Sequence, residues 1–332
     1  MLIIVCHAPL TAQRGGETVF SLLNLTQSAK IASLGGNQVG IEGADLSMLT
    51  NNPSMLDSTH SNQVSVNFTP YMAGINFGHA AYARSFDGVG NFALGFFNVG
   101  YGKFVGADEM GIITGDFTAN ETVIQLAYSR RISPRWHAGA ALKPVFSRIE
   151  VYKSWGLAFD AGLFYRSNNG LTSAGFVLRN VGRQIEAYDQ NIESIRPDLQ
   201  MGISTKLAHA PFRFSMTLQD ILSGTLLYDV PDNNKNVAFE GNSSSKGGFA
   251  DEVFRRFTFG VEFVPSKNFY VAGGYNPRRR HDLKVESKAS TVGFTWGFGF
   301  RVHKFHFAYG SGRYHLGGST NHFSVTTNLS SF

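Results

Sequence analysis

The sequence predicts an all-β fold, a transmembrane antiparallel β-barrel of about fourteen strands with an N-terminal plug segment. Charged residues make up only 16% of the 332 residues, below the roughly 25% of soluble globular proteins. The mean hydropathy is −0.09 and no stretch of ~18 apolar residues occurs, which argues against a helical membrane protein. Apolar residues instead alternate with polar or small ones, as in strands that face lipid on one side.

Residues 1–12 resemble the end of a secretory signal, because a short apolar run is followed by small residues. We therefore expect a partial signal peptide here, with cleavage before Gln13. The single cysteine, Cys6, lies in this stretch, so neither a disulfide framework nor a Cys-based zinc site is expected.

Residues 13–60 lack alternation and mix leucines with small and polar residues, which favours short helices and turns. Because these leucines need a buried environment, we expect the segment to fold inside the barrel as a plug or hatch. The motif Asn52-Pro53-Ser54 is expected to fix a turn of this plug, since a proline restricts the residue before it to an extended conformation.

The barrel itself is predicted over residues 61–332. Alternation is clearest at 292–302, where every second residue is a valine, phenylalanine or tryptophan. About fourteen strands are expected, an even number, as single-chain bacterial barrels require. They are placed at 61–72, 73–86, 90–101, 121–131, 136–149, 154–166, 172–184, 198–208, 210–220, 255–264, 267–276, 289–302, 304–314 and 321–331.

The connections between these strands sort by length. Those after the even-numbered strands are short, whereas those after the third, seventh, ninth and eleventh strands are long, the longest spanning about 221–254. Only the first connection, at 70–72, departs from this rule. Short periplasmic turns alternating with long outer loops are typical of an outer-membrane barrel. We therefore expect the protein in the outer membrane of a Gram-negative cell.

No catalytic constellation, cofactor motif or metal site is found in the sequence, and the protein is predicted not to be an enzyme. Ser243 and Lys246 fit the spacing of penicillin-recognising enzymes, but they lie in a Ser/Gly stretch that favours a flexible loop. His303 and His306 are expected on opposite faces of a strand, where they do not share a metal ion.

The net charge of +5 comes mostly from scattered lysines and arginines, a pattern of solvated surface that gives no reason to expect nucleic-acid binding. Arg278, Arg279 and Arg280 form the only basic cluster of the sequence. Together with the long loops at about 221–254 and 276–288, this cluster is expected to dock an extracellular protein, because arginine is enriched at interfaces. The alternative is that it binds the phosphates of lipopolysaccharide.

Five charged residues lie on polar strand faces and are expected to point into the lumen: Arg84, Asp160, Arg166, Arg213 and Glu262. Two roles are open for them. They line a pathway, or they pair with one another and with the plug.

The N-terminal residues resemble a known family of barrels. The stretch 24–36, followed by Asn52-Pro53-Ser54, resembles the N-terminal hatch of barrels related to the long-chain fatty-acid transporter FadL. Ser54 stands where the pattern of that family has alanine. The resemblance implies a plugged barrel and allows a passive channel for hydrophobic molecules.

Motifs farther along the chain are similar to the PorQ family of the Bacteroidetes type IX secretion system; they lie at 115–117, 127–130, 178–182 and 206–213. This resemblance implies a fourteen-stranded barrel that acts with PorU, PorV and PorZ in a complex that attaches secreted cargo to lipopolysaccharide. It also implies a Bacteroidetes-type outer membrane and a role in holding a PorZ-like protein at the cell surface.

Two functions follow from these observations. The first is a non-catalytic anchor, a plugged barrel that presents loops to a partner; the alternative is a FadL-like passive channel for hydrophobic molecules. A soluble all-β enzyme is disfavoured, because a soluble protein has no reason to sort its loops by parity.

Overall fold

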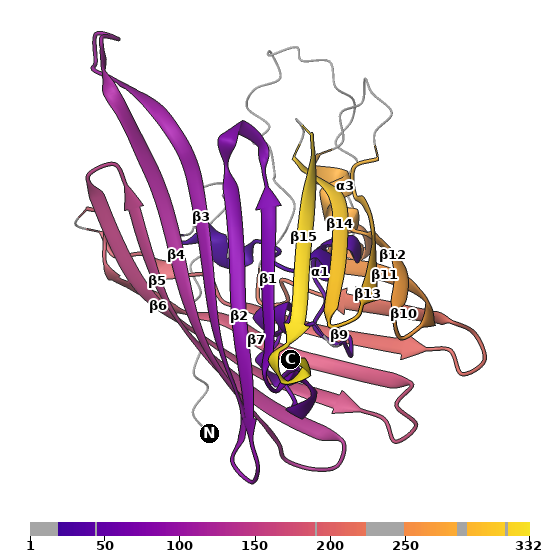
Figure 1. Ribbon diagram of the computed structural model, residues 1–332. Coiled ribbons are helices and arrows are strands. Elements are labelled where there is room, and N and C mark those ends of the chain that lie inside the picture. The colour runs from indigo at the N-terminus through magenta and orange to yellow at the C-terminus, as the bar shows by residue number, and fades with distance from the viewer. Residues whose placement is uncertain (1–18, 44, 190, 224–248, 284–290, 316–317) are drawn as a thin grey trace, which may run out of the picture.

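The strands of the protein form a closed antiparallel barrel in a computed structural model, which describes residues 19–43, 45–189, 191–223, 249–283, 291–315 and 318–332 (Figure 1). The strands are β1 (Gln63–Pro70), β2 (Asn76–Phe86), β3 (Gly90–Ala107), β4 (Ile113–Arg131), β5 (Trp136–Ile149), β6 (Tyr152–Arg166), β7 (Thr172–Glu186), β8 (Ser194–Ile195), β9 (Asp198–Lys206), β10 (Phe212–Leu218), β11 (Phe257–Ser266), β12 (Phe269–Tyr275), β13 (Phe294–Val302), β14 (Phe305–His315) and β15 (Gly318–Asn328). Within the described residues, fourteen of them follow one another round the ring in chain order, and pairing of β1 with β15 closes it. The two-residue β8 lies beside β7. The predicted fourteen-stranded barrel is therefore confirmed.

The connections keep the expected order of lengths after most strands. Short turns join β2 to β3, β4 to β5, β6 to β7, β9 to β10, β11 to β12 and β13 to β14, and they share one end of the barrel, the turn end. The opposite end, the loop end, carries the long connections 187–197, 219–256 and 276–293. The first connection is longer than expected, because β1 stops at Pro70 and η5 (Met72–Gly74) precedes β2.

The prediction of a long loop after the third strand was wrong. Residues 102–120 mostly continue β3 and β4 as a long hairpin, in which Lys103 pairs with Thr118 and the rings of Phe104 and Phe117 stack at 5.2 Å. Glycines interrupt the alternation of this stretch, whereas cross-strand aromatic pairs stabilise antiparallel strands. Pairing across the hairpin therefore extends both strands beyond the point where the sequence pattern stops.

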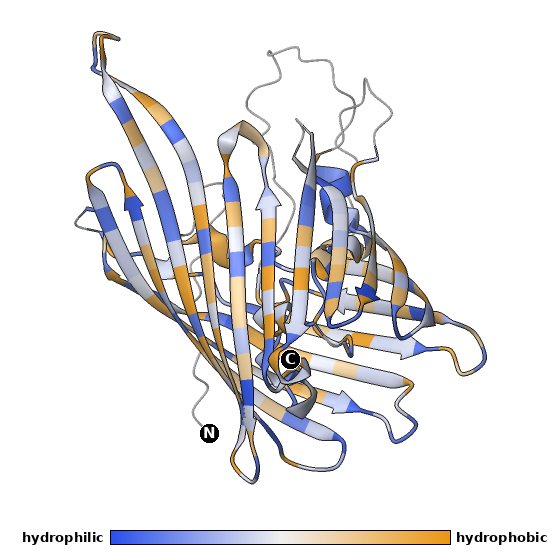
Figure 2. Ribbon diagram, in the orientation of Figure 1, coloured by the Kyte–Doolittle hydropathy of each residue, from blue (hydrophilic) through white to orange (hydrophobic). Residues whose placement is uncertain are grey.

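The wall of the barrel is apolar outside and polar inside. In β1, Val66 and Phe68 are each 51% exposed, whereas Ser65 and Asn67 beside them are buried. Figure 2 shows the same alternation of apolar and polar residues along the other strands. Removing one such apolar side chain from water is worth ~1.5–3 kcal/mol. An outer wall covered with them is suited to contact with lipid.

The N-terminal segment (residues 19–60) lies inside the ring (Figure 1). It forms η1 (Ser21–Asn24), α1 (Ala29–Ser33), η2 (Leu46–Thr50), η3 (Pro53–Met55) and η4 (Ser58–His60). The last four begin after Ser28, Asp45, Asn52 and Asp57, whose side chains accept a backbone hydrogen bond. Helix α1 contacts β12 to β15, η2 contacts β1 and β2, and η3 contacts β4 to β6. The segment thus touches opposite walls of the barrel.

Two short helices stand at the loop end, α2 (Phe249–Arg255) before β11 and α3 (Pro277–Asp282) after β12. The chain finishes with η6 (Leu329–Ser331) after β15. Among the described residues no helix combines the length and the apolar character needed to cross a membrane.

Candidate functional site

Asn52, Pro53 and Ser54 form a buried turn at the start of η3, against the inner wall. Asn52 has the extended backbone that the following proline demands. Its Oδ1 accepts hydrogen bonds from Ser54 N (3.1 Å) and Ser54 Oγ (2.6 Å), and its Nδ2 donates to Val39 O at 3.1 Å. The motif therefore joins two stretches of the N-terminal segment that are distant in sequence.

The wall approaches the backbone of this segment most closely where the wall residue is glycine. A Cβ atom at Gly274 would lie 2.1 Å from Gly35 N, and one at Gly175 would lie 1.8 Å from Val39 O. Such distances exclude any side chain, so these strands hold the segment by backbone contact. Further wall glycines in the same situation are Gly139 and Gly310.

Helix α1 is fixed to the opposite wall by hydrogen bonds. Ala29 N donates to Ser324 Oγ at 3.1 Å, and Gly35 N donates to Thr295 Oγ1 at 2.9 Å. Thr295 Oγ1 in turn donates to Ser33 O at 2.8 Å. The backbone groups at helix ends lack partners within the helix, and here hydroxyl groups of the wall supply them.

Charged side chains of the lumen pair with the N-terminal segment. Glu262 is 1% exposed, and its carboxylate lies 3.1 Å from Lys30 Nζ and 3.4 Å from Arg213 Nη1. Arg213 also donates to Glu42 O at 2.9 Å, and Arg166 forms an ion pair with the Glu42 carboxylate at 2.8 Å. Buried charges are stable only with partners of opposite sign. For these residues the pairing role, one of the two predicted, is confirmed.

Asp160 has its partners within the wall. It forms an ion pair with Lys143, and both side chains are buried. Its Oδ1 accepts from Asn180 N at 2.8 Å, while Lys143 Nζ donates to Asn180 Oδ1 at 3.3 Å.

The lumen-facing prediction was wrong for Arg84, which lies on the outer face with its guanidinium 5.4 Å from the ring of Phe86. Parity places Arg84 outside, because the residues that alternate with it are the buried ones.

The motif at 178–182 also binds the N-terminal segment. Asn180 has a positive φ of 57° where the pairing of β6 and β7 shifts register, which turns its side chain inward. Its Nδ2 donates to Asn24 Oδ1 at 3.1 Å, and Arg179 Nη2 donates to Leu23 O at 3.2 Å. The sequence motif is thus an attachment point for residues 23 and 24.

Toward the loop end, one side of the inner wall is apolar and forms the apolar chamber. Its wall residues are Phe77, Phe97, Val99, Val123, Val145, Ala158 and Ile195. Four residues of the N-terminal segment, Val19, Phe20, Leu22 and Leu23, fill it. Elsewhere the inner wall carries mainly polar side chains or alanines, and the alanines pack against Leu46, Leu49 and Leu56. The chamber is therefore a local exception to the polar interior.

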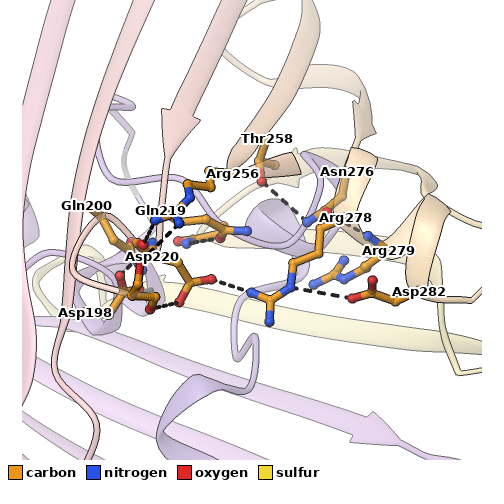
Figure 3. A network of polar contacts seen from close by, with 12 residues as sticks. Asp198, Gln200, Gln219, Asp220, Arg256, Thr258, Asn276, Arg278, Arg279 and Asp282 are labelled. Carbon is orange, nitrogen blue, oxygen red and sulfur yellow. Dashed lines mark hydrogen bonds and ion pairs between the residues drawn. The ribbon is translucent and has the colours of Figure 1, made fainter. Parts of the chain in front are cut away.

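The basic cluster lies in α3 and takes part in a polar network at the loop end (Figure 3). Arg278 forms ion pairs with Asp220 and with Asp282, the latter at 3.5 Å. Asp220 N donates to Asp198 Oδ1 at 2.8 Å. Arg278 thus connects α3 to the loop ends of β9 and β10.

The other two arginines of the cluster also contact the chain. Arg279 Nη1 donates to Gly35 O at 3.0 Å, so it reaches the N-terminal segment, and Arg280 Nη1 donates to Val292 O at 3.4 Å. The structure places all three arginines together, each partly buried. Much of the loops expected beside them, residues 224–248 and 284–290, lies outside the described residues.

Two polar cavities flank the N-terminal segment. One, of about 480 Å³, lies at the loop end and is lined by Asn37, Asn51, Arg179 and Arg279 among others. The second, of about 530 Å³, lies at the turn end. Its lining includes Lys30, Glu42, Glu262 and Lys304. The segment therefore separates a cavity open to the loop side from one open to the turn side.

The remaining candidate residues give no site. Ser243 and Lys246 lie outside the described residues. His303 sits in the turn between β13 and β14, whereas His306 lies in β14 near the ring of Tyr270. In the described part of the chain no three His, Cys, Asp or Glu side chains gather as a metal ion would need.

Sequence reasoning assigned no contact to Lys30, Lys143 or Asn180. The parity of β5 places Lys143 on the inward face, so the rule used for the other lumen charges would have found it. Lys30 lies in a segment without periodicity, and Asn180 acts through a local bulge. Both residues lie in the motifs 24–36 and 178–182 that carry the family resemblances, but no periodicity in the sequence marks the contacts that they make.

No protein-family model matches the chain, and no curated protein sequence is significantly similar to it. Its fold is similar to solved structures of transporters and channels. The toluene transporter TodX of Pseudomonas putida is 11% identical, with a TM-score of 0.53 over 91% of this chain and 97% of that one. The monoaromatic hydrocarbon channel CymD is 13% identical, with a TM-score of 0.50 over 94% and 99%.

A FadL homologue of Pseudomonas aeruginosa has the same degree of similarity. It is 10% identical, with a TM-score of 0.51 over 95% of this chain and 100% of that one. At such identities the likeness concerns the fold alone, and it extends over nearly the whole of each chain. The chain thus has the architecture of FadL-like barrels.

Proposed function

We propose that the protein is a channel of the Gram-negative outer membrane that admits hydrophobic small molecules, with the N-terminal segment as its plug. The apolar chamber carries this proposal. A water-filled lumen gains nothing from an inner wall of phenylalanine and valine, whereas an apolar guest is stabilised by it. In the described conformation Phe20, Leu22 and Leu23 occupy the place of such a guest.

The membrane location is supported by the outer wall and by the connections. Apolar residues cover the outer face, and the long connections all lie at one end while the other end has only short turns, as in bacterial outer-membrane barrels. The substrate class is supported by the fold, which the protein shares with channels described as carriers of toluene and monoaromatic hydrocarbons.

Uptake of toluene into vesicles that contain the purified protein tests the proposal. The double variant Val123→Thr/Val145→Thr adds two hydroxyl groups to the chamber without changing its shape. Because an apolar guest leaves these hydroxyls unpaired, toluene entry is expected to fall about tenfold. The matched control Val261→Thr/Val325→Thr makes the same change on the outer wall and is expected to leave entry unchanged. Entry through wild-type protein no faster than through empty vesicles would contradict the proposal.

A second candidate is the anchoring role in the type IX secretion system, with a PorZ-like protein as partner and PorU and PorV in the same complex. One observation favours it. Arg179 and Asn180 of one PorQ-like motif, and Arg213 of another, all bind the N-terminal segment. The motifs that carry the resemblance therefore hold the N-terminal segment inside the lumen. A lumen that stays filled suits an anchor better than a channel.

Binding of a purified PorZ-like protein tests this candidate. Deletion of residues 230–248 and replacement of Arg278, Arg279 and Arg280 by serine are each expected to weaken binding, provided that the barrel assembles. Because Arg279 also contacts Gly35, protease resistance of the N-terminal segment must be checked in the arginine variant. Full binding by both variants would remove these loops from the proposed interface. Binding to lipopolysaccharide instead of protein would assign the cluster to lipid phosphates.

A further inference from the structure

The β3–β4 hairpin projects beyond the barrel at the loop end (Figure 1). β2 pairs with β3 only as far as Gly100, and β5 pairs with β4 only from Ala119. Between these limits, residues 103–107 pair with residues 113–118. At ~3.3 Å per residue the hairpin extends roughly 20 Å past its neighbours.

The hairpin lies beyond the apolar band of the outer wall. On the outer face of β3 the band ends at Asn98, whose Nδ2 donates to Asn120 Oδ1 at 2.7 Å and to Thr122 Oγ1 at 2.9 Å. Past these polar residues the side chains face water. The hairpin nevertheless exposes large apolar residues, with Val105 65% exposed and Ile113 71% exposed. Exposed apolar surface of this kind in water marks a binding surface.

The edge of β4 is the more open of the two hairpin edges. Glu150 N donates to Thr118 O at 3.1 Å, which shows that the backbone of Thr118 faces away from β3. Alternation in an antiparallel pair then turns the backbone of Asp116 to the same side. On the β3 edge, by contrast, a Cβ atom at Gly102 would lie 3.4 Å from Gly74 O of η5, so η5 covers its base.

We propose that residues 113–118 of β4 bind an extended segment of an extracellular protein, which adds to the sheet as a further strand and carries alternating basic and apolar side chains. Unpaired strand edges are templates for this mode of recognition. Residues 101–118 contain one lysine and three carboxylates, Lys103 against Asp108, Glu109 and Asp116, hence a net charge of −2. This charge selects a basic partner.

A second copy of the same chain is a worse occupant of this edge. Antiparallel pairing of two β4 edges would bring Asp116 of one copy toward Asp116 of the other, and like charges opposite each other destabilise a pair of strands. The proposal uses the membrane orientation given above, because that orientation puts the hairpin outside the cell. It is independent of what passes through the lumen.

Hydrogen–deuterium exchange of the full chain in detergent tests the proposal, with a short peptide in which valine alternates with lysine as the probe. The peptide is expected to slow exchange of the amides at 113–118. A peptide N-methylated at every second residue, on the edge that faces β4, is expected to lose this effect, while methylation of the opposite edge preserves it. Asp116→Lys is expected to weaken peptide binding about tenfold. The matched control Asp87→Lys, in a turn at the other end, is expected to leave binding unchanged.

Equal binding of the two N-methylated peptides, or of Asp116→Lys and wild type, would overturn strand addition. Concentration-dependent dimerisation without peptide would instead identify a second copy as the occupant and would also overturn the proposal. Toluene entry is measured separately, so a failure of the channel proposal leaves this result interpretable. Labelling of a cysteine at Glu109→Cys on intact cells checks the orientation by itself.

Discussion

Two parts of the N-terminal segment are held in the barrel by different kinds of contact. Residues 19–25 are held mainly by side chains in the apolar chamber, notably Leu22 and Leu23, besides the hydrogen bonds from Arg179 and Asn180. Residues 26–43 and 45–57 also bury apolar side chains such as Leu46, but in addition they are held through their backbone against wall glycines, through hydroxyl groups and through the buried Glu262 pairs. An apolar ligand can replace the side-chain contacts that residues 19–25 make in the chamber. It cannot replace the backbone contacts and ion pairs of the later residues. We therefore expect a ligand to displace residues 19–25 and to leave the later part of the segment in place.

Loss of the Glu262 carboxylate is expected to have the largest effect, because it removes the buried ion pairs that hold the later part of the segment. Glu262→Gln leaves Lys30 and Arg213 without their shared counter-charge, at an expected cost of ~3–5 kcal/mol. The loss of stability is expected to increase protease cleavage between residues 26 and 44 in the folded barrel, which mass spectrometry detects. Glu42→Gln is the matched control, because the exposed pair with Arg166 is worth less than ~1 kcal/mol. Similar protection in both variants would show that charge does not hold this part.

Truncation in the apolar chamber sharpens the comparison through ligand rescue. Leu22→Ala removes a fully buried side chain, which costs ~2–5 kcal/mol and leaves an apolar cavity. Toluene is expected to raise the thermal midpoint of this variant, because it fills the cavity. Leu46→Ala, in the part held against wall alanines, makes the same truncation and is expected to show no such gain. An equal rise of the thermal midpoint in Leu22→Ala and Leu46→Ala would mean that the two parts of the segment do not differ in whether a ligand can replace their side-chain contacts.

Filling one wall glycine tests the backbone contacts directly. Gly175→Val places a side chain where Val39 O lies 1.8 Å from the first added atom, and the overpacking is expected to cost ~1–3 kcal/mol and to displace the segment. Gly273→Val is the control, since its Cβ would face the outside with the nearest atom 3.8 Å away. Increased proteolysis in the first variant alone is the expected result. If the N-terminal segment of Gly175→Val resisted proteolysis as in wild type, the strands of the wall would have moved instead of the segment.

The smallest expected effect concerns the end of the segment. Burial by itself would raise the pKa of Asp57, but the hydrogen bond and charge of His60, with the hydrogen bonds of Thr59, lower it from 3.8 to about 2. Asp57 therefore stabilises the fold above pH 3.8, and this contribution is lost as the pH falls toward 2. Proteolysis near residue 60 by an acid-active protease is expected to increase over this range in wild type. In Asp57→Asn the pH dependence should be absent.

The sequence indicates the barrel because alternation with period two is a local property. Val66 and Phe68 on one face of β1 and Ser65 and Asn67 on the other can be assigned without knowing any partner strand. The same rule predicts the pairing of Arg213 and Glu262 inside the lumen as one of two roles, but not Lys30 as their partner. Lys30 belongs to a segment without period, whose path the strands do not dictate.

What the amino-acid sequence alone determined was the alternation of apolar and polar faces along most strands, and hence the fourteen-stranded wall with its apolar outer face and the short turns at one end. Only the tertiary structure decided how the N-terminal segment lies within that wall. The glycines that admit its backbone, the bulge that turns Asn180 inward and the chamber filled by Leu22 and Leu23 each depend on contacts between residues far apart in the chain. A wall needs only the repeat of its own strands, whereas the path of the N-terminal segment depends on the particular shape of the space that the closed ring leaves.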